Sequence, residues 1–322
     1  MLLNLLEYHW AEHLDDALML LSRQDIKTVP LAGGTQLLGQ QDESIQAVVD
    51  LRDVGLSYIT SDTRGVHIGA MTTLQELVEA PVLKSIANGI ISHAAKASAP
   101  SLAIRNAATI GGTLGAGLLS HSDLLTVFAA LDVEVVLRSG SQTQINLSGG
   151  TSERPGLSLS GVTYKGKAER RVAFRSLDLD RRPNELILEV VIPPVRPVIA
   201  GAFMRAGRTF ADHALINAAA LVLLHEGKYQ QVRLALGGLN MEPVRLQAIE
   251  RHLEGKEITE PRMHQIWAAL QAGINEFNPP LDESVSGVYR RVSGMSLAYR
   301  VLEEAMNVSQ WRGMVASSEG RV

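Results

Sequence analysis

The sequence predicts an α+β protein built from more than one compact unit, and three observations support this. The first part of the chain alternates short apolar segments of strand type with amphipathic helical segments. The last third places its strands before its helices, an order typical of α+β domains. The length of 322 residues also exceeds what one small core needs.

In the N-terminal part, strands are predicted over 27–32, 47–51 and 65–71, and a helix follows Tyr8 over 14–21. Thr73-Leu-Gln-Glu76 fits a capping box, in which the threonine and glutamate side chains each accept a backbone N–H at the start of a helix. A long helix is predicted from residue 82 to residue 98.

The middle and C-terminal parts follow the same reasoning. Past a helix that starts at Ser122-Asp123, we expect an extended loop or loose hairpin over 139–180, because that stretch has little periodicity. The remaining predicted strands are 132–137, 185–192, 203–205, 216–225 and 231–239. The predicted C-terminal helices are 244–253, 261–276 and 288–306, and the tail after residue 308 is expected to be polar and frayed.

Composition excludes several classes of function. The formal charge of −4 gives no basic face for nucleic acid. The longest apolar run, residues 214–224, is too short for a membrane span, and the N-terminus lacks the features of a secretion signal, so a cytoplasmic protein is expected. The absence of cysteine excludes disulfides and thiolate-held iron–sulfur clusters within this polypeptide. Any redox centre here must therefore be an organic cofactor.

Two glycine pairs each follow an apolar strand-like run, in Leu31-Ala-Gly-Gly-Thr-Gln-Leu37 and Thr109-Ile-Gly-Gly-Thr-Leu-Gly-Ala-Gly117. A Gly-Gly turn frees backbone N–H groups to converge on an anion and keeps side chains out of the way. Two such turns would suit the two phosphates of a dinucleotide. The alternative is that each pair only permits a sharp turn. The glycine spacing does not fit the G-x-G-x-x-G motif of a Rossmann fold.

Five sequence blocks in one order resemble the FAD-binding (medium) subunit of the molybdenum hydroxylases, a family that includes xanthine dehydrogenase and aerobic carbon monoxide dehydrogenase. The blocks are Ala32-Gly-Gly-Thr-Gln-Leu-Leu38; Thr109-Ile-Gly-Gly112 followed by Ser122-Asp-Leu-Leu125; Ala129-Ala-Leu-Asp132; Asn184-Glu-Leu-Ile187; and Leu236-Gly-Gly-Leu239 with Pro243-Val-Arg245.

The resemblance implies the fold in more detail. It implies an FAD-binding PCMH-type fold, like that of vanillyl-alcohol oxidase, made of two α+β subdomains over about 1–56 and 57–196. A C-terminal domain over 197–306 is implied to consist of a three-stranded antiparallel sheet with a helix bundle, followed by a polar tail over 307–322.

The resemblance also implies the cofactor site, with FAD as the cofactor. The first FAD loop corresponds to Ala32, Gly33, Gly34, Thr35, Gln36 and Leu37, and the second to Thr109, Ile110, Gly111 and Gly112, with Thr113 after it. Asp123 corresponds to an aspartate that accepts hydrogen bonds from cofactor hydroxyls, a task that suits a carboxylate because it offers only acceptors. Leu186 and Ile187 lie in the strand that closes over the adenine side.

By the same resemblance, this is an oxidoreductase subunit that takes electrons from an iron–sulfur subunit, itself supplied by a molybdopterin subunit, and passes them through FAD to NAD, a quinone or oxygen. Two departures motivate an alternative, a non-flavin scaffold subunit of the same complex: Thr113 replaces the usual asparagine, and the 117–122 turn lacks proline. A self-contained flavin oxidase would need an internal acid or base, which the sequence does not reveal.

Other motifs carry less weight. His9-Trp-Ala-Glu-His13 matches the H-x-x-E-H pattern of some zinc peptidases, but it spans a strand-to-helix junction, so no metal site is predicted. Arg205, Arg208 and His213 stand at the start of the C-terminal domain, where a solvated turn is expected. No catalytic side chain is assigned, which fits a protein whose chemistry belongs to its cofactor.

Overall fold

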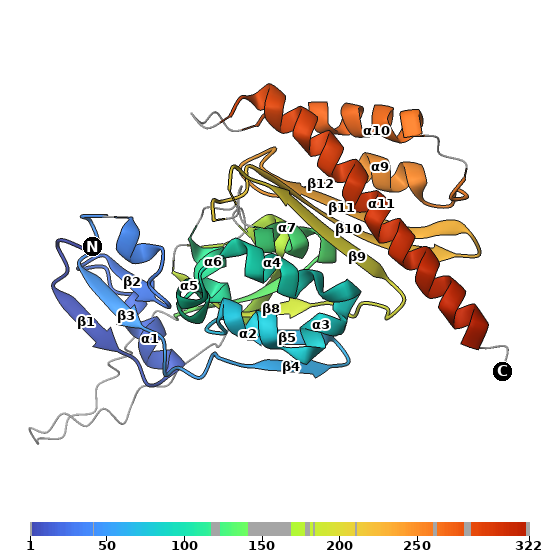
Figure 1. Cartoon of the computed structure of the whole chain (residues 1–322). Coiled ribbons are helices and arrows are strands. Elements are labelled where there is room, and N and C mark those ends of the chain that lie inside the picture. Colours follow the sequence, from blue (N-terminus) through green and yellow to red (C-terminus); the bar gives the residue numbers. More distant parts are fainter. Residues whose placement is uncertain are drawn as a thin grey trace, which may run out of the picture.

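The computed structural model describes residues 2–40, 42–116, 123–140, 169–177, 181–182, 184–209, 211–259, 263–279 and 285–319. Within these ranges the chain forms three units in sequence order, each built on its own β-sheet (Figure 1). The mixed helix-and-sheet architecture confirms the predicted fold class. Every helix in these ranges is too short or too polar to serve as a membrane span.

The N-terminal unit is a parallel three-stranded sheet in the order β1-β3-β2. Helix α1 packs against it because its buried Ala17 and Leu18 share a hydrophobic core with Val49 and Leu51 of the central strand region. The elements are β1 (Glu7–Trp10), α1 (Leu14–Leu21), β2 (Thr28–Leu31), the short helix η1 (Leu37–Gly39) and β3 (Ala47–Asp50). The predicted helix and strands are confirmed here.

The middle unit is a five-stranded antiparallel sheet in the order β4-β5-β8-β6-β7. Its strands are β4 (Ile59–Asp62), β5 (Gly65–Gly69), β6 (Glu134–Ser139), β7 (Glu169–Ala173) and β8 (Glu185–Ile192), with the short helix η4 (Phe174–Ser176) after β7. The antiparallel pairing of β7 with β6 agrees with the hairpin alternative for 139–180, and residues 141–168 of that stretch lie outside the described ranges.

The α-helices described in this unit are α2 (Leu74–Glu79), α3 (Pro81–Ser85), α4 (Ile90–Ser98), α5 (Leu102–Ala107), α6 (Ile110–Gly115) and α7 (Asp123–Leu131). The capping box of Thr73 and Glu76 at the start of α2 is confirmed, since both reciprocal hydrogen bonds form. Helix α7 is buried along its whole length, as its almost continuous apolar sequence requires. It packs against α4 on one side and against β10 and β11 of the next unit on the other.

The prediction of one long helix over 82–98 is wrong. The short helix η2 (Ile86–Gly89) interrupts it, because Ala87, Asn88 and Gly89 all have positive φ angles. The physical reason is close packing with the third unit. A Cβ atom on Gly201 of β9 would lie 2.4 Å from the carbonyl oxygen of Ala87, so the backbone of the break lies directly against that strand.

The C-terminal unit is an antiparallel sheet in the order β12-β11-β10-β9. It has three long strands and a two-residue fourth: β9 (Ala200–Ala206), β10 (Ile216–His225), β11 (Lys228–Gly237) and β12 (Val244–Arg245). The predicted hairpin turn at Glu226-Gly227 is confirmed, and both residues have positive φ. The predicted helix over 244–253 begins later, as α9 (Gln247–Leu253), because Val244 and Arg245 pair with β11.

The other helices of this unit are α10 (Met263–Asn275) and α11 (Gly287–Glu319), and α11 runs obliquely along the sheet (Figure 1). The expectation of a frayed tail after residue 308 is wrong, since α11 continues to Glu319. Two contacts secure this extension: Ser309 Oγ accepts the N–H of Leu224 at 3.2 Å, and Arg312 Nη1 donates at 3.0 Å to the carbonyl oxygens of Pro197 and Ile199.

Candidate cofactor site

The first glycine turn begins where β2 ends, at the carboxyl edge of the parallel sheet. Gly34 has a φ angle of +70°, which explains why glycine stands there. The carbonyl oxygens of Gly34 and Gln36 accept N–H groups from η1, at 3.1 and 3.0 Å. Among the described residues, no acceptor pairs with the backbone N–H groups of residues 33–36. Four adjacent donors are therefore available to a ligand.

The second glycine turn differs from the prediction, because its N–H groups are already used. Thr109 caps α6: its Oγ1 accepts the N–H of Gly112 at 3.0 Å. The N–H groups of Ile110 and Gly111 donate to the carbonyl oxygens of Thr72 and Ala70, at 2.9 and 2.8 Å. The hypothesis of a second set of free amides is therefore wrong. The first N–H groups of a helix have no partner within the helix, and here the Thr109 cap and two carbonyl oxygens of the neighbouring segment accept them.

The two turns lie against each other. A Cβ atom on Gly33 would lie 1.6 Å from the carbonyl oxygen of Ala107, so the first turn touches the segment that leads into the second. A Cβ on Gly112 would lie 3.9 Å from Cβ of Ala32. The structure thus brings together two turns that stand far apart in the sequence. Free donors in one turn and small residues in both suit a phosphate-containing ligand, so the residues present fit FAD.

The remaining second-loop residues serve the helix. Thr113 Oγ1 donates to the carbonyl oxygen of Thr109 at 2.9 Å, which turns its side chain back onto α6. Leu186 and Ile187 are buried in β8. This strand lies next to the second turn, because Ala70 links the two: its carbonyl oxygen accepts the N–H of Gly111, and its own N–H donates to the carbonyl oxygen of Leu188 at 2.8 Å. That Leu186 and Ile187 border the adenine of FAD stays a prediction.

Asp123 is buried, 1% exposed, and lies at the junction with the C-terminal unit. Asn217 Nδ2 donates to its Oδ1 at 2.8 Å, and Arg205 Nε lies 3.2 Å from its Oδ2. Thr126 Oγ1 donates to Asn217 Oδ1 at 2.6 Å and so orients that amide. Burial raises the pKa of Asp123 to about 6, against the opposing effects of Arg205 and Asn217. Its contact with cofactor hydroxyls stays a prediction.

This junction corrects the expectation of a solvated turn at Arg205, whose side chain is only 14% exposed. It also explains the glycine of the Leu236-Gly-Gly-Leu239 block. A Cβ on Gly237 would lie 2.3 Å from Asn217 Oδ1 and 2.4 Å from Thr126 Oγ1, so only glycine leaves room for that pair. Sequence patterns did not predict Asn217, because an asparagine within an apolar strand resembles an isolated core residue.

Two further family blocks meet in a second polar junction. Arg245 forms a bidentate pair with Glu250, at 2.6 and 2.7 Å, and its Nη1 donates to Asp132 Oδ1 at 2.9 Å. Arg233 and Arg175 also pair with Asp132, which has a φ angle of +52° at the end of α7. The blocks ending in Asp132 and Arg245 therefore join the middle unit to the C-terminal unit and are not part of the glycine turns.

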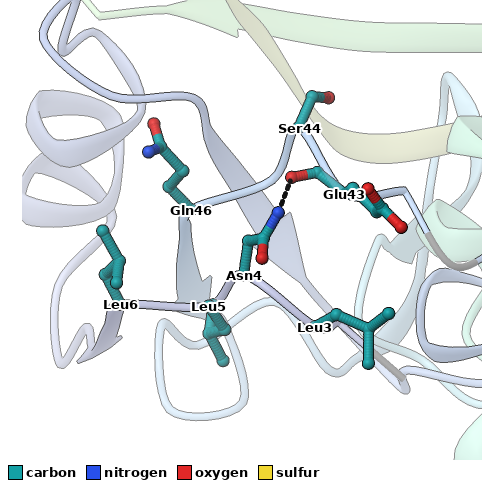
Figure 2. Close-up of a pocket in the computed structure, with 7 residues that line it drawn as sticks. All are labelled: Leu3, Asn4, Leu5, Leu6, Glu43, Ser44 and Gln46. Carbon is teal, nitrogen blue, oxygen red and sulfur yellow. Dashed lines mark hydrogen bonds between the residues drawn. The ribbon is translucent and has the colours of Figure 1, made fainter.

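A separate shallow pocket lies at the opposite, amino-terminal edge of the parallel sheet (Figure 2). Asn4 Nδ2 donates to the carbonyl oxygen of Glu43 across it at 2.9 Å. Its lining residues are Leu3, Asn4, Leu5, Leu6, Glu43, Ser44 and Gln46. Since it lies before β1 and β3 whereas the first glycine turn follows β2, the pocket is not part of the candidate site.

The histidines of the H-x-x-E-H match are placed by a strand and a helix cap. His9 lies on β1, with Nε2 2.7 Å from Glu7 Oε2, and His13 precedes α1. Within the described ranges, no three histidine, aspartate or glutamate side chains gather in a way that could hold a metal ion.

Comparison with known proteins identifies the family. Residues 4–195 match the model of the FAD-binding domain in molybdopterin dehydrogenase. The chain belongs to this family. Residues 201–305 match the C-terminal domain of the CO dehydrogenase flavoprotein. FAD is therefore the cofactor, as the resemblance implied.

Curated relatives agree with this assignment, and solved structures share the fold. The glyceraldehyde dehydrogenase medium chain of Sulfolobus acidocaldarius is 26% identical, covering 92% of this chain and 97% of the relative. The nicotinate dehydrogenase FAD-subunit of Eubacterium barkeri is 24% identical over 89% and 94%. A carbon monoxide dehydrogenase chain of Hydrogenophaga pseudoflava shares the fold, with a TM-score of 0.79, 22% identity, and coverage of 94% of this chain and 98% of that one.

Proposed function

We propose that the chain is the FAD-binding electron-transfer subunit of a molybdopterin-dependent hydroxylase or dehydrogenase. In this proposal it takes electrons from an iron–sulfur subunit and delivers them to NAD, a quinone or oxygen. The observation that carries the proposal is the contact between the two glycine turns, inside the segment matched by the FAD-binding family model. The N–H groups of residues 33–36 find no acceptor in the described part of the chain.

The residues divide the binding task by their chemistry. The N–H groups of residues 33–36 donate to the pyrophosphate, because its oxygens need donors and the glycines keep side chains away. The second turn, residues 109–113, supplies a close-packed wall and not donors. Asp123 accepts from cofactor hydroxyls through lone pairs that Asn217 and Arg205 leave free. Leu186 and Ile187 border the adenine side. Bound FAD supplies the redox chemistry, and no catalytic side chain of this chain is assigned.

Partner subunits follow from chemistry and from the relatives. The chain has no cysteine, so thiolate ligands of an iron–sulfur cluster must come from another polypeptide. The relatives are named as a medium chain and an FAD-subunit, which supports assembly with iron–sulfur and molybdopterin subunits. We further propose domains over 1–196 and 197–306, with the cytoplasm as the location.

The test is the visible spectrum of the purified chain after incubation with excess FAD and removal of free flavin. Flavin absorbance is expected, together with binding to the partner subunits when these are supplied. A protein that stays colourless refutes the proposal. The alternative is a scaffold subunit that binds its partners without flavin, and the occupied N–H groups of the second turn favour it. Calorimetry against FAD separates this alternative from the proposed function.

A further inference from the structure

Helix α5 lies between the parallel-sheet unit and helices α4 and α6 (Figure 1), yet its apolar side chains do not hold it there. Leu102 is 53% exposed and Ile104 is 47% exposed. The one buried side chain of this helix is Arg105, at 8% exposure. A surface helix is normally fixed by an apolar stripe that faces the core. Here the polar contacts of one arginine must do so.

The guanidinium of Arg105 makes three hydrogen bonds. Its Nη1 donates to the carbonyl oxygens of Ala99 and Pro100, at 2.7 and 2.9 Å, and its Nε donates to Gln75 Oε1 at 2.8 Å. Ala99 and Pro100 stand just before the helix, and Gln75 lies on α2. The planar, permanently charged guanidinium fits such divergent acceptors, and a lysine would reach fewer of them.

Helix α5 leads directly into the contact between the two glycine turns. The last residue of α5, Ala107, presents the carbonyl oxygen against which Gly33 lies. The chain then passes through Ala108, whose carbonyl oxygen accepts the N–H of Leu74 at 2.8 Å, to Thr109, the cap of the second turn. A shift of α5 would therefore change the position of one turn relative to the other.

We propose that Arg105, oriented by Gln75, is a positioning residue of the FAD site that holds the two glycine turns at the separation the cofactor needs. The inference rests on the proposed function. It adds a role for a side chain that does not touch the turns itself and acts through the backbone of α5.

The test compares Arg105→Ala with Arg290→Ala. Arg290 is a matched control because it is fully buried and also donates to two carbonyl oxygens, those of Leu215 and Gly238, in the C-terminal unit. In the folded protein, Arg105→Ala is expected to raise the Kd for FAD by about tenfold or more, because the charged hydrogen bonds that fix α5 are lost. It is also expected to alter the visible circular dichroism of bound FAD. Arg290→Ala should lower the melting temperature and leave the Kd and the dichroism unchanged.

Low millimolar guanidinium chloride, compared with equal sodium chloride, should restore FAD affinity to Arg105→Ala, because the ion fills the vacated position. A lowered melting temperature with wild-type Kd and wild-type dichroism overturns the proposal. If Arg105→Ala does not fold, Gln75→Met decides, because it removes one of the three bonds: a two- to fivefold rise in Kd supports the proposal and an unchanged Kd overturns it. Failure of the wild-type chain to bind FAD would instead refute the proposed function.

Discussion

Replacement of Gly33 by alanine tests the contact between the two turns most directly. The new methyl group would lie 1.6 Å from the carbonyl oxygen of Ala107, whereas ordinary contact begins at 3.4 Å. The turns must therefore separate by the difference, 1.8 Å. Such a shift exceeds what a hydrogen bond tolerates, so at least one donor of residues 33–36 should lose its phosphate oxygen.

A hydrogen bond to a charged group contributes about 1.5–3 kcal/mol, so the loss of one bond should raise the Kd for FAD about 10- to 150-fold. Isothermal titration calorimetry measures this Kd, and thermal unfolding of the apoprotein reports the fold. Gly39→Ala is the matched control, because Gly39 lies at the end of η1, directly after the turn, and no atom lies within 4 Å of its Cβ position. Wild-type affinity in Gly33→Ala would refute the reasoning.

Two further predictions concern the junctions between the units. Burial raises the pKa of Asp123 from 3.8 to about 6, so the folded state binds this proton more tightly than the unfolded state does. The protonated carboxyl therefore adds to the free energy of unfolding below about pH 4, and this contribution is lost as the pH rises through 6. Relative to Asp123→Asn, wild-type stability in urea unfolding should therefore fall by about 2 kcal/mol between pH 4 and pH 7, and a pH-independent difference would contradict this. Arg245→Met leaves the buried Glu250 carboxylate without its charged partner, with only the N–H of Leu234 still donating to it, and should cost about 3–5 kcal/mol in chemical denaturation. The exposed Arg251→Met should change stability by less than about 0.5 kcal/mol, and equal effects of the two would rule out a junction role.

Local patterns in the sequence were sufficient for most elements and for the family. The strands at 185–192 and 216–225 were predicted with their observed bounds, and the capping box at Thr73 forms as its spacing indicates. Such features depend on residues close together in the chain, which is why periodicity and turn residues reveal them. The glycine pairs likewise led to the prediction of a dinucleotide cofactor, and the match to an FAD-binding family model agrees with it.

The tertiary structure alone decided which backbone donors remain available and which residues join the units. Both glycine pairs look alike in sequence, yet the first keeps its N–H groups and the second donates them to Ala70, Thr72 and Thr109. The break at residues 87–89 exists because β9 packs against it. The junctions at Asp123 and Arg245 join residues about a hundred positions apart. A hydrogen bond depends on partners that only folding brings within 3 Å, so no local pattern encodes it.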